Sequence, residues 1–165
     1  MRRITIILSI LFILVAGTAF AQKGPNDAAG AFISTNFNTT YEQLTAIGFD
    51  SQSRAIVGTI MVKLPAGYNG NHVVACWVDW SNNGVYQNAY ATNEYAGAAT
   101  RYTPNPPSTP VYYGISIPIA PLPGTLNNNY NVKCILTWME IPTNSDYNAI
   151  WGNALEGKIH IDGLY

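Results

Sequence analysis

The sequence predicts an all-β protein, an antiparallel β-sandwich of about seven strands. Several segments alternate between apolar and polar residues with a period of two, and they are rich in β-branched and aromatic residues. Turn residues such as Gly, Pro and Asn separate these segments, and no segment has the period of an amphipathic helix. Two packed sheets are the simplest way to bury the apolar faces of such strands.

The N-terminus has the pattern of a secretory signal peptide. Two arginines precede an apolar run over residues 4–15, and Ala-Phe-Ala at 19–21 supplies small residues before a cleavage site. The apolar run is shorter than the ~20 residues that span a bilayer, so a membrane anchor is the less favoured alternative. We expect a signal peptide over 1–21, a single domain over 22–165, and a bacterial protein that is extracellular or on the cell surface, without a transmembrane segment.

Two predicted strands alternate most clearly. In 54–64, one face carries Ile56, Gly58, Ile60, Val62 and Leu64. In 130–139, one face carries Tyr130, Val132, Cys134, Leu136 and Trp138. Such faces point toward a core.

The remaining elements follow from composition and turn residues. Apolar and β-branched runs predict strands over 31–37, 73–80, 111–119 and 157–165. Residues 41–49 fit neither period cleanly, and residues 84–101 are irregular with a brief pairing over 85–90. The proline-rich segment 103–110 is expected to form an exposed loop, because proline cannot donate to a strand ladder. The strand number suggests an immunoglobulin- or fibronectin-III-like sandwich.

The two cysteines, Cys76 and Cys134, each lie in the middle of a predicted strand with apolar residues two positions away on both sides. Alternation therefore directs both sulfurs to the core. In an oxidising compartment we expect them to form a disulfide. Two buried free thiols are the alternative.

Several motifs occur in an ordered series. Residues 77–84 read WVDWSNNG, residues 115–118 read ISIP and residues 157–162 read GKIHID. In this order, over residues 55–165, the chain resembles the GEVED domain of secreted bacterial surface proteins. The resemblance implies an accessory surface module without catalysis. Asn83 stands where the family usually has Asp, so the resemblance implies the fold more than an ion site.

The turn after the strand 73–80 is one candidate site. Asp79, Ser81 and Asn83 alternate and precede Gly84, a spacing that is typical of calcium-binding turns. Calcium takes about six to eight oxygen ligands, and Asp79 is the only charged residue of this turn. Two hypotheses stay open: a calcium ion bound by these three residues, or a plain Asx turn in which Asp79 accepts backbone N–H groups. No other cofactor is expected.

Aromatic residues near predicted loops form the second candidate site. Rings beside asparagines suit sugar binding, because one face of a pyranose is apolar and its hydroxyls pair with amides. We expect the surface over 79–102 to bind a glycan or a partner protein through Trp80, Tyr86, Tyr90, Glu94, Tyr95 and Tyr102.

Composition and charge narrow the function classes. Charged residues make up only 10% of the chain and the formal net charge is −1, so the composition does not favour binding to nucleic acid. No serine lies in a nucleophile-elbow sequence and neither histidine has metal-ligand spacing, so no catalysis is expected. We expect a secreted recognition or adhesion module. The alternative is a structural subunit, a homo-oligomer that builds a coat or filament through an edge strand such as 157–165.

Overall fold

The computed structural model describes residues 31–32, 39–65, 68–87, 94–104, 108–120, 127–147 and 150–162. None of these residues is helical, and their strands form two antiparallel sheets. The strands are β1 (Ala31–Phe32), β2 (Glu42–Asp50), β3 (Ala55–Val62), β4 (Gly70–Asp79), β5 (Tyr95–Thr103), β6 (Val111–Pro118), β7 (Asn128–Trp138) and β8 (Asn153–Ile161). The predicted all-β sandwich is confirmed, and its immunoglobulin or fibronectin-III type stays a prediction.

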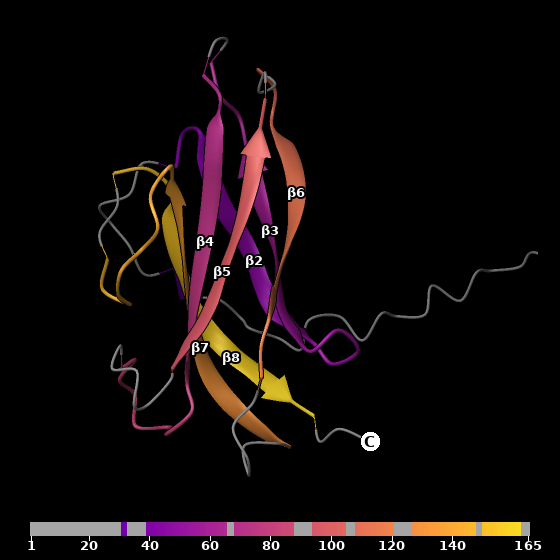
Figure 1. Ribbon diagram of the computed structural model, residues 1–165, viewed down its shortest axis with the longest axis vertical. Helices are drawn as coiled ribbons and strands as arrows, with labels where there is room; N and C mark the ends of the chain where they lie inside the picture. Colours follow the sequence, from indigo (N-terminus) through magenta and orange to yellow (C-terminus); the bar gives the residue numbers. More distant parts are fainter. Residues whose placement is uncertain are drawn as a thin grey trace, which may run out of the picture.

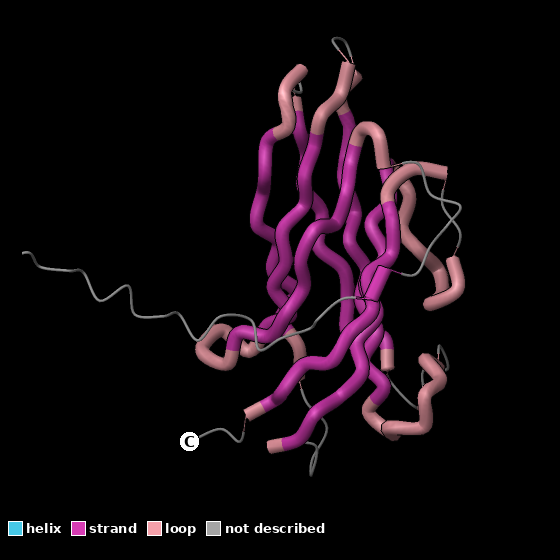
Figure 2. The backbone as a smooth tube through the Cα atoms, turned by 180° about the vertical axis from the view of Figure 1, so that it is seen from behind, coloured by secondary structure: helices cyan, strands magenta, loops and turns pink. Residues whose placement is uncertain are grey.

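The two sheets have five and three strands. The larger has the order β1-β8-β7-β4-β5 and the smaller the order β2-β3-β6. Between the sheets, β2 lies against β8 and β6 lies against β5, so the layers meet along both sides. Most strands run along the long axis of the molecule (Figure 1). Figure 2 shows that strands make up the body of the fold, with the described loops at its ends and along one side.

The main core lies between the sheets and follows the predicted alternation. In β3 the inward residues Ile56, Ile60 and Val62 are fully buried, whereas on the other face the residues from Val57 to Met61 are partly exposed. In β7 the inward residues from Tyr130 to Leu136 are buried and Trp138 is partly buried, but Ile135 and Thr137 on the opposite face are buried as well. A second, smaller cluster covers that outer face of the larger sheet: Ala75, Trp77, Ile135 and Ala154, with Tyr86 and Tyr147 packed against them.

The disulfide between Cys76 and Cys134 is confirmed. The two residues are direct partners on neighbouring strands, β4 and β7, with Cα atoms 4.1 Å apart. Both belong to the core between the sheets, as the alternation predicted. The bridge joins two strands of one sheet, however, and does not tie one sheet to the other.

Three strands differ from the sequence-based expectation. β2 is a regular strand, and its pattern was ambiguous because a register shift between Leu44 and Ala46 interrupts the period of two. β5 was not predicted, since its small residues, such as Gly97, give no alternation and most of it is exposed at a sheet edge. β8 begins at Asn153 rather than at Gly157.

Several predictions concern the margins of the described residues. The signal peptide over 1–21 lies outside them, as do residues 33–37 of the first predicted strand, residues 88–90 of the brief pairing and residues 163–165 of the last predicted strand. Residues 85–87 are described and are not in a strand. No described segment forms a helix with the length and hydropathy of a membrane span.

Candidate functional site

The loop after β4 folds around the carboxylate of Asp79, which is fully buried. Its Oδ1 accepts hydrogen bonds from the Ser81 hydroxyl and the Asn83 backbone N–H, both at 3.1 Å. Its Oδ2 accepts from the Gly84 N–H at 2.8 Å and from the Asn131 side-chain amide at 3.3 Å. Gly84 has a φ of 80°, a left-handed conformation that lets the chain close around the carboxylate. Asp79 therefore holds the turn together.

Glu94, the residue immediately before β5, contacts the same turn. It is buried, and its Oε1 lies 3.1 Å from the same Ser81 hydroxyl that contacts Asp79. Its Oε2 accepts the backbone N–H of Gln87, and its backbone carbonyl accepts the N–H of Val78 at 2.8 Å. Hydrogen bonds from N–H groups stabilise a buried carboxylate that would otherwise be costly to desolvate. We call this region, with Asp79, Ser81, Asn83 and Glu94, the Asp79 end of the sandwich.

The structure thus brings together the three residues of the predicted calcium turn, Asp79, Ser81 and Asn83. The oxygens that would bind the ion already accept hydrogen bonds, since the Oδ1 of Asn83 takes the Val85 N–H at 2.8 Å. N–H groups aimed at these oxygens repel a cation. Among the residues that the structure describes, no group of three or more His, Cys, Asp or Glu side chains could hold a metal. This geometry supports the Asx turn, and calcium binding stays a hypothesis.

The predicted aromatic surface is spread over several parts of the fold. Trp80 packs its ring edge-to-face against Tyr130, with centroids 5.1 Å apart, beside the main core. Tyr86 covers the outer face of the larger sheet, and Tyr95 lies against Trp77 at 5.4 Å between ring centroids. Tyr90 lies outside the described residues.

Tyr86 and Tyr102 show how far apart the predicted residues lie. The Tyr86 hydroxyl donates to Glu156 at 2.6 Å, and burial together with that carboxylate raises the pKa of Tyr86 well above its usual range. Tyr102 pairs with Asn71 at the start of β4, whereas Asp79 is the last residue of that strand. The structure therefore joins Glu94 to the turn at Asp79 but does not bring the predicted rings into one surface.

A cavity that sequence reasoning missed lies at the opposite end of the sandwich, where β2 and β4 begin and β3 and β7 end. Its volume is about 130 Å³, and the residues that line it are Tyr41, Glu42, Leu64, Pro65, Tyr68, Trp138 and Trp151. The rings form two tilted pairs: Tyr41 with Trp151 at 5.2 Å between centroids, and Tyr68 with Trp138 at 6.2 Å. We call this cavity the aromatic pocket.

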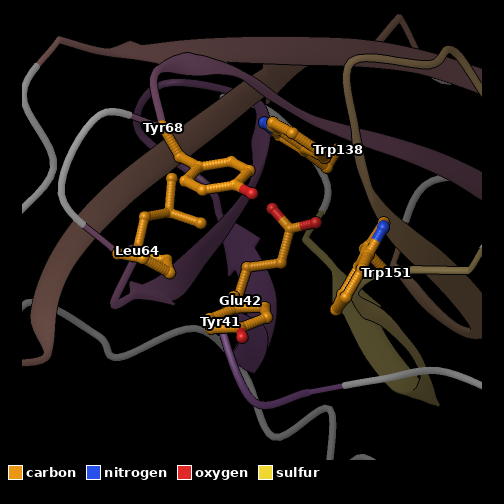
Figure 3. A pocket seen from close by; sticks show the side chains of 7 residues that line it. Tyr41, Glu42, Leu64, Tyr68, Trp138 and Trp151 are labelled. Atoms are coloured by element: carbon orange, nitrogen blue, oxygen red, sulfur yellow. The ribbon is translucent and has the colours of Figure 1, made fainter.

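The carboxylate of Glu42 points into the space between Tyr68, Trp138 and Trp151 (Figure 3). Glu42 is fully buried, and its Oε2 pairs with the Nδ1 of His72, which is buried too. Its Oε1 accepts no hydrogen bond from any residue that the structure describes. A buried polar atom without a partner is unfavourable and rare in folded proteins. The pocket therefore holds an acceptor that a ligand could satisfy.

Gly70 allows the indole of Trp138 to take its place beside the pocket. A Cβ at position 70 would lie 2.3 Å from the indole nitrogen, far closer than atoms can approach. Only glycine therefore lets the start of β4 pass this close to the ring.

The sequence contains one signal for this site. Glu42 is two residues before the buried Leu44, and His72 is two residues before the buried Val74. In a strand, such residues share the inward face. A polar side chain at an inward position, in each of two strands, indicates a buried polar pair.

Comparisons of the chain with models of known protein families, with curated proteins and with solved structures find no match. The resemblance to the GEVED family therefore has no support beyond its motifs and stays a hypothesis.

Proposed function

We propose that this protein is an extracellular recognition module without catalytic activity, and that it binds its ligand in the aromatic pocket. The observation that carries the proposal is the Oε1 atom of Glu42, a buried acceptor without a described donor that lies against a cavity lined by rings. Apolar walls with a few oriented polar groups are typical of ligand sites. The disulfide is compatible with an extracellular location.

The chemistry of the pocket favours binding over catalysis. Glu42 and His72 are paired with each other, and the described lining residues include no serine, cysteine or second carboxylate. Hydrolysis by a nucleophile or by a carboxylate pair needs one of these. Asp79 and Glu94 lie at the other end of the fold and are buried within their own turn.

Two tyrosines of equal exposure provide a test. Tyr68 lines the pocket, Tyr102 does not, and each is 53% exposed. We expect Tyr68→Leu to weaken the binding of pocket ligands on the order of tenfold, because an aromatic wall is lost. Tyr102→Leu should leave binding unchanged.

The four tryptophans report where a ligand binds. Trp138 and Trp151 line the pocket, whereas Trp77 and Trp80 lie near the Asp79 end. In a fragment screen by NMR, the indole N–H signals of Trp138 and Trp151 should shift selectively. Ligands that shift Trp77 and Trp80 instead, or that lose affinity only in Tyr102→Leu, would contradict the proposal and favour the surface predicted over 79–102.

A self-associating structural subunit is the second candidate. β8 has β7 on one side, and among the described strands only two residues of β1 pair with its other side. Unpaired strand edges can add a strand from another molecule. Ordered polymers in electron microscopy of the oxidised protein would favour this candidate, and monomers in size-exclusion chromatography would contradict it.

A further inference from the structure

We infer that the aromatic pocket takes an alkylammonium group, that is, a protonated amine with methyl or methylene substituents. The inference rests on the proposed function and specifies the ligand of that site. Three properties of the pocket carry it: a carboxylate oxygen to which no described residue donates, walls made of rings, and a small volume.

The acceptor is the Oε1 atom of Glu42. His72 contacts only Oε2, and no described residue donates to Oε1. A buried carboxylate is stabilised when a cation both balances its charge and donates a hydrogen bond. An ammonium N–H meets both requirements, whereas a neutral apolar ligand meets neither.

The walls suit the substituents of the same cation. Four of the seven lining residues are aromatic: Tyr41, Tyr68, Trp138 and Trp151. The face of an aromatic ring carries negative charge and attracts a cation within about 6 Å of its centre, with tryptophan the most effective. Methyl groups on nitrogen share the positive charge and are also apolar, so they fit such walls better than a hydrated metal ion does.

The volume separates this ligand from a sugar. At about 130 Å³ the pocket is slightly smaller than an apolar cavity of about 150 Å³ that holds benzene. A methyl- or dimethylammonium group is smaller than benzene, keeps an N–H that can donate, and fits. A pyranose ring with its hydroxyls is larger and would not enter whole, so the pocket takes the head group of a larger molecule whose remainder stays outside.

The test uses two small probes of the same shape. N,N-dimethylethanolamine, protonated at neutral pH, and 3-methylbutan-1-ol differ only in an N–H⁺ in place of a C–H. In NMR titrations of the oxidised full chain, the amine should shift the indole signals of Trp138 and Trp151 and bind on the order of tenfold tighter than the alcohol. Methyl glucoside is the third probe.

Substitutions of two acidic residues test whether Glu42 causes the preference for the amine. Glu42→Gln should weaken binding of the amine on the order of tenfold and leave the alcohol unchanged, because the shape is kept and the charge is removed. Glu140→Gln is the control, since Glu140 is exposed and lies two residues from Trp138. If Glu42→Gln does not fold, Tyr68→Leu tests the ring wall instead, with the same preference for the amine expected to decrease.

The outcomes distinguish this inference from the proposed function. Equal affinity for the amine and the alcohol, or a shift of Trp138 and Trp151 by methyl glucoside alone, would overturn the ammonium ligand and leave a pocket that binds. No shift by any of the three probes would also overturn it. The fragment screen with Tyr68→Leu and Tyr102→Leu then decides, separately, whether the pocket is a binding site at all.

Discussion

Both ends of the sandwich bury a carboxylate, but they provide very different hydrogen-bond partners for it. At the Asp79 end, two backbone N–H groups, a hydroxyl and a side-chain amide donate to the two oxygens of one side chain. At the pocket end, Glu42 has only His72, on one oxygen, among the described residues. The first carboxylate is satisfied by its own turn, and the second has an acceptor left over.

The difference supports a structural role for the Asp79 end and is the basis of our proposal that the pocket end binds a ligand. A carboxylate surrounded by backbone donors stabilises the loop that supplies them. A buried acceptor without a donor is unfavourable for folding, and a ligand in the adjoining cavity could donate to it. The Asp79 turn, which the sequence pattern favoured as a site, is thus the better candidate for a structural role. The aromatic pocket at the other end is the better candidate for binding.

The largest loss of stability is expected on removal of the disulfide, which lies between the two ends. The chain-entropy model gives a loss of about 4 kcal/mol of unfolding free energy for the Cys76→Ala/Cys134→Ala variant, given a separation of 58 residues. Urea unfolding of the variant, of the oxidised protein and of the reduced protein measures this loss. Both ends should unfold together, so a transition of Trp80 that precedes that of Trp138 would show that the ends are not one cooperative unit.

The second-largest loss of stability is expected from a substitution of Asp79. In Asp79→Asn the amide nitrogen faces backbone N–H groups, and we expect a loss of about 2–3 kcal/mol with unchanged pocket binding. Asp50→Asn is the matched control. Asp50 accepts the Gln52 N–H at 3.1 Å and the Ser53 hydroxyl at 2.6 Å in an exposed turn, where water replaces lost contacts, so less than about 1 kcal/mol is expected. Equal losses in the two variants would mean that burial of Asp79 adds nothing.

At the pocket end, we expect a substitution to change binding and to leave stability nearly unchanged. Glu42→Gln removes a buried charge and keeps a partner for His72, so the unfolding free energy should stay within about 1 kcal/mol of the original protein while binding of the amine weakens. Chemical denaturation beside the titration checks both quantities. A loss as large as that of Asp79→Asn would make Glu42 a structural residue and remove the basis of the pocket proposal.

The smallest effect is expected from calcium. Because the oxygens of Asp79 and Asn83 already accept hydrogen bonds, millimolar calcium and a chelator should give melting midpoints within about 1 °C of each other. A rise of several degrees with calcium that Asp79→Asn abolishes would establish an ion site at this end.

Local pattern accounts for the elements that could be predicted. The alternation in β3 and β7 revealed their inward faces, and it directed both cysteines to the core. It failed at β2, where a register shift interrupts the period, and at β5, where small residues give no contrast between faces. The turn at Asp79 was recognisable because three of the four groups that donate to the Asp79 carboxylate belong to the five residues that follow it.

Local pattern indicates that Glu42 and His72 face inward, but it could not predict the pocket that Glu42 lines. Its lining comes from the start of β2, from residues after β3, from the end of β7 and from the approach to β8. Glu42 and His72 are 30 positions apart in sequence. No spacing rule relates residues that meet only when two sheets pack.

By itself, the sequence determined an all-β chain with inward-facing cysteines and a polar turn at Asp79, because period-two alternation and turn chemistry act between near neighbours. Only the tertiary structure decided that Cys76 lies opposite Cys134. It also decided that Glu42 lines the aromatic pocket, with one carboxylate oxygen that accepts no hydrogen bond from the described residues. These depend on strand register and on the packing of one sheet against the other, which are interactions between distant parts of the chain.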